Sequence, residues 1–296
     1  MNPHQAGDID RDALADALER EARLHLPYLE EAVGWLRGLL CGGDEVAAAA
    51  AVGRVLDVGS GPGVVACLLA RYFPCAQIVA VDRDPGLLER ARSRAEGADL
   101  TGRVITQHAD LPGDFGELGD ADVIWASKAV HHLGDQQAAL DALAASLRPG
   151  GVLAVAERGL PPRFLPRDIG IGRPGLQARL DAVLEDEFSS LRARLPGHER
   201  TVEDWPAMLA RAGLVPTGSR TFLVDHPAPL DLPAREHLYR LLEHWQERIG
   251  DRLDAEDRRT LECLVDGDAC TGILWRPDAF YLTAVTVHTA RACTRR

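Results

Sequence analysis

The chain has 296 residues, 46% of them hydrophobic, which is enough to bury a large core in one elaborated domain or in two. Its 45 acidic and 33 basic side chains give a formal charge of −12, which argues against a nucleic-acid partner because such proteins present basic surfaces. No segment reaches the roughly twenty apolar residues of a membrane helix, and residues 1–12 lack the apolar run of a signal peptide, so we expect a cytoplasmic protein without a membrane partner.

The six cysteines are scattered and form no C-x-x-C pair. This pattern predicts reduced thiols and disfavours a disulfide or zinc framework. The adjacent His131 and His132 lack a third ligand at a suitable spacing, so no metal site is expected.

Residues 8–40 predict two helices, because apolar residues recur four apart and Pro27 can start the second helix. Strands then alternate with helices, which is typical of a parallel sheet covered on both faces. The predicted strands are 54–58, 77–82, 103–107, 121–126, 152–157, 217–224 and 278–289. The predicted helices among them are 63–72, 85–96, 135–147, 175–195, 201–211, 233–249 and 254–266.

Short local signals set several of these boundaries. Asp84 before Pro85 is a good helix start, an N-cap acid followed by proline at the first helical position. Residues 148–151, RPGG, end a helix, and residues 201–204, TVED, resemble a capping box that opens another. Residues 158–174 are rich in proline, glycine and arginine, so we expect a loop there.

Residues 55–63, VLDVGSGPG, carry the strongest functional signal. They form a short apolar strand that contains an acid and leads through three glycines, spaced two apart, into a helical run. Glycine has no Cβ, so such a loop lets backbone N–H groups approach a polar ligand closely. Asp57 adds a negative charge that a dinucleotide site would avoid. The combination suits a ligand with both a carboxylate and an ammonium, such as the methionine part of S-adenosylmethionine.

This motif resembles the first motif of the class I S-adenosylmethionine-dependent methyltransferases, which has the form hydrophobic-hydrophobic-Asp/Glu-hydrophobic-Gly-x-Gly-x-Gly. Asp82 ends the next strand about twenty residues past the loop, the separation expected when two adjacent parallel strands end at one nucleoside. The resemblance implies that the glycine loop wraps the amino-acid end of the cofactor. It also implies that Asp82 holds the ribose hydroxyls.

The resemblance extends this assignment to a set of cofactor-binding candidates. Asp110 matches an acceptor for the adenine amino group, Leu111 an apolar contact with the ring, and Arg83 a contact along the adenine face. The full set is Asp57, Gly59, Ser60, Gly61, Gly63, Asp82, Arg83, Asp110, Leu111 and Ser127. Structural interpretations stay open for its members: capping for Asp57, a plain turn for the glycines and Asp110, and solvation for Arg83.

The segment after the fourth predicted strand resembles the corresponding family motif, including its frequent paired histidines. His131 and His132 are therefore candidate catalytic bases, because an imidazole titrates near neutral pH, but structural hydrogen bonding is the favoured explanation for both. Residues at the sheet edge and in the helical additions are candidates for an acceptor pocket, with ordinary packing as the alternative. These are Tyr28, Trp35, Lys128, Glu157 and Arg158.

The resemblance implies an α/β fold with a seven-stranded, mostly parallel, doubly wound sheet whose last strand is antiparallel. The helical additions depart from the family pattern. We expect residues 1–45 and inserts at about 158–200 and 226–276 to form a helical cap on a Rossmann-like domain of residues 46–296. The alternative is a dimerisation surface, so a homodimer is a further expectation.

The implied function is methyl transfer from S-adenosylmethionine to a small organic acceptor at O, N or C, by proximity and alignment. One alternative is a protein of the same fold that binds this cofactor without methylating, as a rearrangement catalyst or a regulator. A nicotinamide oxidoreductase is a weaker alternative, because residues 59–64 lack the third glycine of G-x-G-x-x-G.

Overall fold

The computed structural model describes residues 11–41 and 51–294. The first residues of the predicted N-terminal helix and the predicted domain boundary at residues 45 and 46 lie outside this part. The chain divides into two compact units. The first contains residues 1–157, 196–222 and 286–296, and the second contains residues 158–195 and 223–285.

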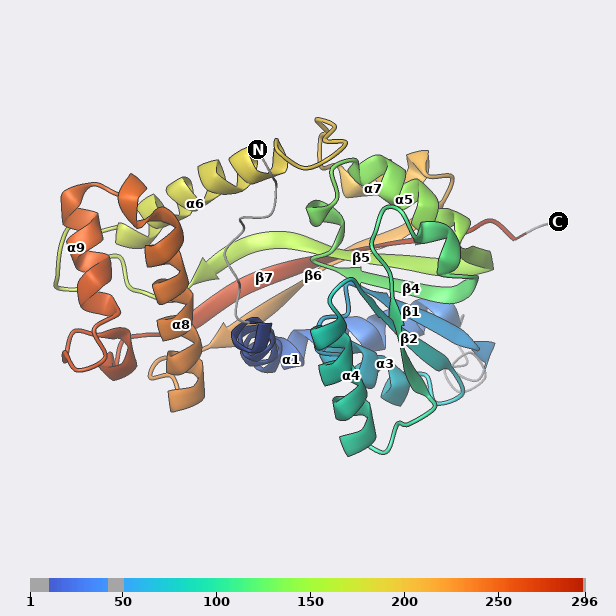
Figure 1. The fold of residues 1–296 in the computed structure, drawn as a ribbon, viewed down its shortest axis with the longest axis horizontal. Helices are drawn as coiled ribbons and strands as arrows, with labels where there is room; N and C mark the ends of the chain where they lie inside the picture. The colour runs from blue at the N-terminus through green and yellow to red at the C-terminus, as the bar shows by residue number, and fades with distance from the viewer. Residues whose placement is uncertain (1–10, 42–50, 295–296) are drawn as a thin grey trace. The chain divides into compact units, whose positions relative to one another are not determined.

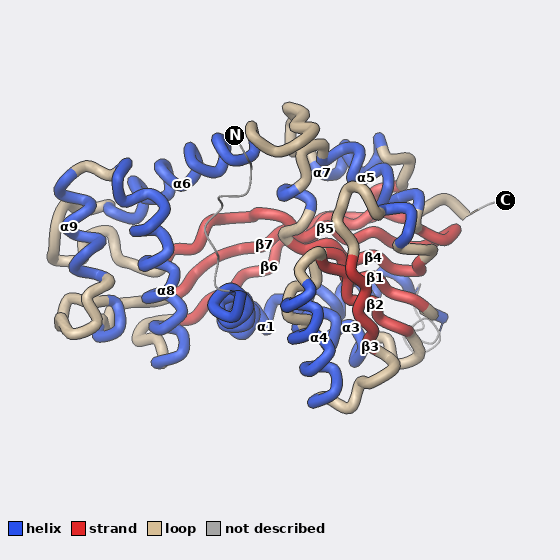
Figure 2. Tube along the Cα trace, viewed as in Figure 1, coloured by secondary structure: helices blue, strands red, loops and turns tan. Residues whose placement is uncertain are grey.

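Within the described residues, seven strands form one sheet in the order β3-β2-β1-β4-β5-β7-β6. Figure 2 shows the first five of these strands side by side in the first unit. Their bounds are β1 Arg54–Val58, β2 Gln77–Asp82, β3 Val104–His108, β4 Ala121–Ser127, β5 Leu147–Arg163, β6 Val215–His226 and β7 Tyr281–Arg291.

Six of the strands share one direction and β7 opposes them. β1 pairs in parallel with β2 and β4, β2 with β3, and β4 with β5. Along β6 and β7 the partners run in opposite order, because Thr217 bonds Thr289 and Thr221 bonds Thr286 through their hydroxyls, at 2.8 and 3.0 Å. The predicted mostly parallel sheet with an antiparallel last strand is therefore confirmed.

Helices cover both faces of the sheet in the first unit (Figure 1). α1 Arg11–Cys41, α3 Val64–Tyr72 and α4 Pro85–Gly97 pack together on one side. α5 Gln136–Ala145 and α7 Trp205–Arg211 pack on the other, where they share a core with Leu56 and Ile124 of the central strands. This is the doubly wound arrangement that the alternating pattern predicts.

The second unit is mainly helical, with α6 Leu176–Arg192, α8 Leu232–Ile249 and α9 Ala255–Leu264. Its core includes Phe164 against Trp245, with ring centroids 5.6 Å apart. Arg179 of α6 donates two hydrogen bonds, of 2.6 and 2.7 Å, to the buried carboxylate of Asp257 in α9. Such a bidentate pair fixes the two helices relative to each other.

The prediction of two helices over residues 8–40 is wrong, because α1 is continuous and contains Pro27. An internal proline costs a helix about 3 kcal/mol. Large apolar residues after Pro27 are nevertheless almost fully buried, namely Tyr28, Leu29, Val33 and Leu36. Burying each large apolar side chain is worth about 1.5–3 kcal/mol, so burial outweighs the proline. Along the described part of the chain, neither α1 nor any other helix has the length and apolarity to cross a membrane.

Two other local predictions are corrected. β5 begins at Leu147 and continues to Arg163, so residues 148–151 and 158–163 are strand rather than loop. Pairing with β7 explains the extension at its start, where Gly150 N–H donates to Ala292 O. α7 begins after Asp204, which accepts from Ala207 N–H at 3.1 Å, so residues 201–204 are not the predicted capping box.

Gly63 lies at the start of α3 and packs closely against Ala91 of α4. Its φ is +76°, and a Cβ there would lie 2.6 Å from Ala91 Cβ. Gly102 has a similar φ of +79° but open space around it. We expect Gly102→Ala to lower the free energy of unfolding by about 1–2 kcal/mol through backbone strain alone. Gly63→Ala should lose about 1–3 kcal/mol more through overpacking. Equal losses in denaturant unfolding would contradict this packing.

Candidate functional site

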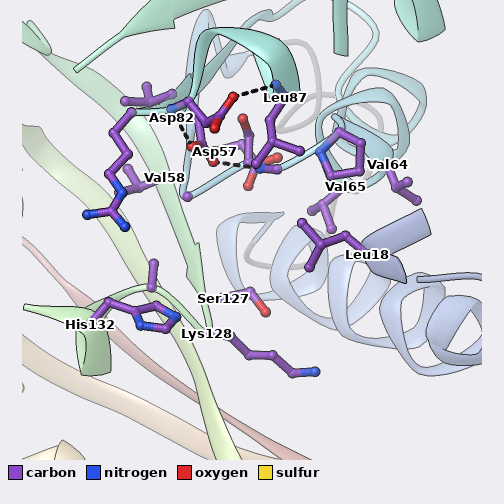
Figure 3. Close-up of a pocket in the computed structure, with 18 of the residues that line it drawn as sticks. Leu18, Asp57, Val58, Val64, Val65, Asp82, Leu87, Ser127, Lys128 and His132 are labelled. Atoms are coloured by element: carbon purple, nitrogen blue, oxygen red, sulfur yellow. Dashed lines mark hydrogen bonds between the residues drawn. The ribbon is translucent and has the colours of Figure 1, made fainter. Parts of the chain in front are cut away.

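The carboxyl ends of β1, β2 and β4 meet at one edge of the sheet, the edge where open α/β sheets bind ligands. A cavity of about 500 Å³ opens there, between these strand ends and α1. Figure 3 shows Asp57 and Asp82 on one side of it and Ser127, Lys128 and His132 on the other.

The β1–α3 loop forms one wall. Gly59 N–H and Ser60 N–H both donate to Val81 O of β2, at 2.9 and 3.0 Å, which holds the loop against the neighbouring strand. Gly59 has a φ of +72°, and a Cβ there would lie 2.8 Å from Ala129 Cβ, so no larger residue fits. The loop thus brings its backbone to the cavity with no side chain at Gly59.

Asp82 links this loop to the turn after β2. Its Oδ2 accepts from Gly61 N–H at 2.9 Å and its Oδ1 accepts from Asp84 N–H at 3.0 Å (Figure 3). Asp84 in turn caps α4 by accepting from Gly86 and Leu87 N–H groups, as predicted. A carboxylate offers about four acceptor positions, so Asp82 keeps capacity for two hydroxyl donors.

Asp57 is an ionisable group buried at the floor of the cavity. It is 2% exposed, and its Oδ2 has no hydrogen-bond partner among the described residues. Burial, and then the charge of Asp82, raise the pKa of Asp57 to about 7, against a weaker lowering by the Ala66 N–H. A buried acceptor without a partner is costly, and a cationic donor placed in the cavity would satisfy it.

α1 forms the opposite wall. Its residues at helical spacing face the cavity: Leu14, Leu18, Glu21, Ala22, His25, Tyr28 and Leu29. The Tyr28 phenol bonds Ser127, and burial raises its pKa despite the nearby Lys128. His25 is 5% exposed and lies edge-on to Tyr28, with centroids 5.4 Å apart. α1 therefore supplies both an apolar surface and polar groups.

Lys128 links the carboxyl end of β4 to α1. It follows β4 with a φ of +51°, a conformation that is uncommon for a residue with a side chain. Its Nζ lies 2.5 Å from Glu21 Oε1 of α1. Burial lowers the pKa of Lys128, but the Glu21 carboxylate and the Tyr28 phenol outweigh it and the pKa is raised overall. Lys128 is thus a charged, paired ammonium at the rim.

The two histidines lie differently. His132 lines the cavity, whereas His131 does not. His131 Nδ1 lies 2.7 Å from Oε2 of the buried Glu157, whose Oε1 accepts from Val130 N–H at 3.1 Å. Glu157 thus anchors the segment that carries both imidazoles. Among residues 11–41 and 51–294, no group of three or more His, Cys, Asp or Glu residues is arranged to hold a metal ion.

Most of the predicted site residues meet at this cavity. Those that line it are Tyr28, Asp57, Gly59, Ser60, Gly61, Asp82, Arg83, Leu111, Ser127, Lys128 and His132. Asp110 is exposed and instead forms a turn with Asp114, and Gly63 packs on Ala91. Trp35 packs against Phe222, with centroids 6.1 Å apart, and Arg158 lies in the second unit.

Glu21 and His25 are cavity residues that the sequence analysis missed. The signal was present, because they follow Leu18 by three and seven positions and so share its face of the helix. Polar residues within the apolar face of a helix indicate that this face lines a cavity as well as packing in the core.

Comparisons with known proteins bear on the family of the chain. Residues 55–151 match the family described as Methyltransferase domain. Over 203 residues, the chain is 33% identical to trans-aconitate 2-methyltransferase of Methylobacterium nodulans, which covers 63% of this chain and 74% of that protein. Over 155 residues, it is 32% identical to 27-O-demethylrifamycin SV methyltransferase of Amycolatopsis mediterranei, covering 49% of this chain and 56% of that protein.

Other curated relatives are matched over less of their length. The chain spans 24%, 38% and 48% of three further proteins. Among solved structures, an O-methyltransferase family protein from Burkholderia thailandensis superposes with a TM-score of 0.53 at 18% identity. That match covers 97% of this chain and 60% of the other, and at this identity it shows a shared fold.

The raised pKa of Asp57 predicts a pH-dependent affinity for S-adenosylhomocysteine. The ligand's ammonium favours the ionised carboxylate, so affinity should rise about tenfold between pH 6 and 8 as Asp57, with a pKa of about 7, loses its proton. Calorimetry across this range checks the trend, and Asp57→Asn, which should flatten it, corrects for titration of the ligand itself. A wild-type profile as flat as that of the variant would contradict the assignment.

The same group predicts the pH dependence of stability without ligand. Its folded-state pKa of about 7 lies above the ordinary value of 3.8, so the folded protein binds more protons than the unfolded chain between these limits. The contribution of Asp57 to stability is therefore full at pH values below 3.8 and is lost as the pH rises towards 7. Thermal unfolding of wild type and Asp57→Asn at pH 5 and 8 measures this difference.

Asp82→Ala should weaken S-adenosylhomocysteine binding by about 1–3 kcal/mol, the scale of a lost charged hydrogen bond. The variant also removes the bonds to Gly61 and Asp84, so loop order contributes to the loss. Asp135→Ala is a matched control, because Asp135 caps α5 outside the cavity. Equal affinities of the Asp82 variant and wild type in calorimetry would remove Asp82 from the site.

Proposed function

Because this chain belongs to the class I S-adenosylmethionine-dependent methyltransferases, we propose that it transfers the cofactor's methyl group to a small organic acceptor bound beside α1. The observation that carries the proposal is one cavity with two different walls. The glycine loop and Asp82 suit the cofactor, and α1 with Lys128 and His132 would line the position of a second molecule.

The residues present fit the cofactor. The unpartnered Oδ2 of Asp57 would accept from its ammonium, and the backbone of the glycine loop would approach its carboxylate. Asp82 would receive two ribose hydroxyls, and Leu111 would contact the adenine ring. When bound, the cofactor supplies a methyl carbon made electrophilic by a positively charged sulfur.

The size and lining of the cavity support a small acceptor. A volume of about 500 Å³ lies within the usual range for small-molecule sites, roughly 300–1,000 Å³, and it would have to hold the cofactor and the acceptor together, so the acceptor would be small. Both relatives named above carry names of small-molecule methyltransferases. The net charge of −12 disfavours a nucleic-acid acceptor for the same reason as before.

The protein's catalytic task is mainly alignment. Holding an acceptor atom in line with the methyl carbon can contribute about 7–11 kcal/mol to the lowering of the barrier. The apolar face of α1, with Leu14, Leu18 and Leu29, would exclude water from the contact. No covalent intermediate is required of any side chain.

We assign the removal of an acceptor proton to His132 rather than His131. His132 lines the cavity, while His131 is directed to Glu157 and positions the segment. The same proposal keeps the other sequence-based expectations: a cytoplasmic enzyme of biosynthesis, a homodimer, and a helical cap formed by α1 and the inserts. The free cysteines, with Cys75, Cys263, Cys270 and Cys293 exposed, are consistent with a reducing compartment.

The direct test is transfer of a labelled methyl group from S-adenosylmethionine to a small-metabolite extract. We expect a labelled organic product and its dependence on Asp57. Tight binding of S-adenosylhomocysteine without any product would instead favour a non-methylating protein. Binding of NADH in its place would favour an oxidoreductase.

With an acceptor in hand, His132→Gln should lower kcat at pH 7 by about 10²–10⁴-fold, the usual contribution of a general base. The affinity for S-adenosylhomocysteine should stay unchanged, because the variant leaves the glycine loop intact. His288→Gln is the matched control, since His288 lies outside this cavity. A His132 variant with wild-type kcat would assign the proton to solvent.

A further inference from the structure

We propose that the acceptor end of the cavity selects an uncharged, largely apolar molecule, and that Glu21 of α1 sets this selectivity by neutralising Lys128. The inference rests on the proposed function, since it concerns the molecule bound beside the cofactor. It names a residue that the sequence analysis had left out.

The charges of the cavity separate into two groups. Asp57, Asp82 and Arg83 belong to the strand ends that face the cofactor. At the other end, the charged side chains among the described lining residues are Glu21 and Lys128. Their closest atoms are 2.5 Å apart, so each compensates the other and this end carries no net formal charge.

The cavity that contains this pair is lined mostly by apolar side chains. α1 contributes Leu14, Leu18, Ala22 and Leu29, and Val64 and Val65 lie at the start of α3. The Tyr28 phenol is nearly buried and already bonded to Ser127. The cavity therefore offers apolar contact area, and its acceptor end adds a compensated ion pair.

A charged acceptor would meet a penalty in this setting. An anionic acceptor would approach Lys128 but would also face the Glu21 carboxylate that already occupies it. A cationic acceptor would face Lys128 and the positively charged sulfur of the cofactor. Each charge would lose water without gaining an unoccupied partner, which is the unfavourable case for burying an ion.

The backbone at Lys128 indicates that this arrangement is held in place. A residue with a side chain at a φ of +51° requires support from its surroundings, and such residues cluster at functional sites. Lys128 N–H donates to Ala156 O at 2.9 Å, which fixes the backbone, and the pair with Glu21 then fixes the side chain. The ammonium is thus directed to α1.

The test uses three fluorescent probes of one shape: 6-hydroxy-2-naphthamide, 6-hydroxy-2-naphthoate and (6-hydroxynaphthalen-2-yl)methylamine. At pH 7.5 they are neutral, anionic and cationic. Their dissociation constants are measured with and without saturating S-adenosylhomocysteine, whose own binding is measured separately in each variant. Wild type should bind the amide at least about tenfold more tightly than either charged probe.

Glu21→Gln should shift the ratio of naphthoate to amide affinity about tenfold towards naphthoate, and Lys128→Gln should shift it towards the amine. The double variant should regain the preference for the amide. Glu31→Gln is the matched control, because Glu31 lies on the exposed side of the same helix and outside the cavity. It should leave all ratios at the wild-type values.

Wild type that prefers the naphthoate, or a Glu21 variant with unchanged ratios, would overturn the inference. So would a change of the same size in the Glu31 variant, or binding of none of the probes. These outcomes are separate from a failure of the proposed function, which would appear as absent S-adenosylhomocysteine binding or absent methyl transfer.

Discussion

The site depends on the Asp82 carboxylate, whose two oxygens accept from Gly61 N–H and Asp84 N–H. One side chain thereby fixes the glycine loop after β1 and the turn that starts α4. Without it, two loops from different strands would have to hold their separation unaided. Asp82 thus orders the binding surface and still has acceptor capacity for a ligand. A surface that is ordered in advance loses less entropy on binding.

The buried carboxylate of Asp57 lowers the stability of the folded protein and, under the proposed function, favours binding of the cofactor. Its burial without a full set of donors costs stability, and the cost is concentrated at the point where a cationic group of the cofactor would lie. The core around it, formed by the central strands and their covering helices, is extensive enough to tolerate the cost. Under the proposed function, the same unmet acceptor would favour an ammonium at this floor of the cavity.

Local sequence signals predicted the sheet and the residues of the loop wall of the cavity, because residues 55–63 and Asp82 belong to short strand-turn-helix units with their own geometry. They did not predict the continuity of α1 through Pro27, which depends on burial against distant elements. Nor did they predict the length of β5, which depends on pairing with β7, more than a hundred positions later. The missing roles of Glu21 and His25 have the same cause, since Lys128 and the cavity come from remote parts of the chain.

The two walls of the cavity differ in how far their residues can be replaced. Cβ distances at Gly59 and Gly63 leave almost no room for change in the loop. α1, by contrast, presents its lining from a single continuous segment that contributes no residue to β1–β7. Under the proposed function, substitutions within this one helix would reshape the wall beside the acceptor, while the loop that would hold the cofactor stays unchanged.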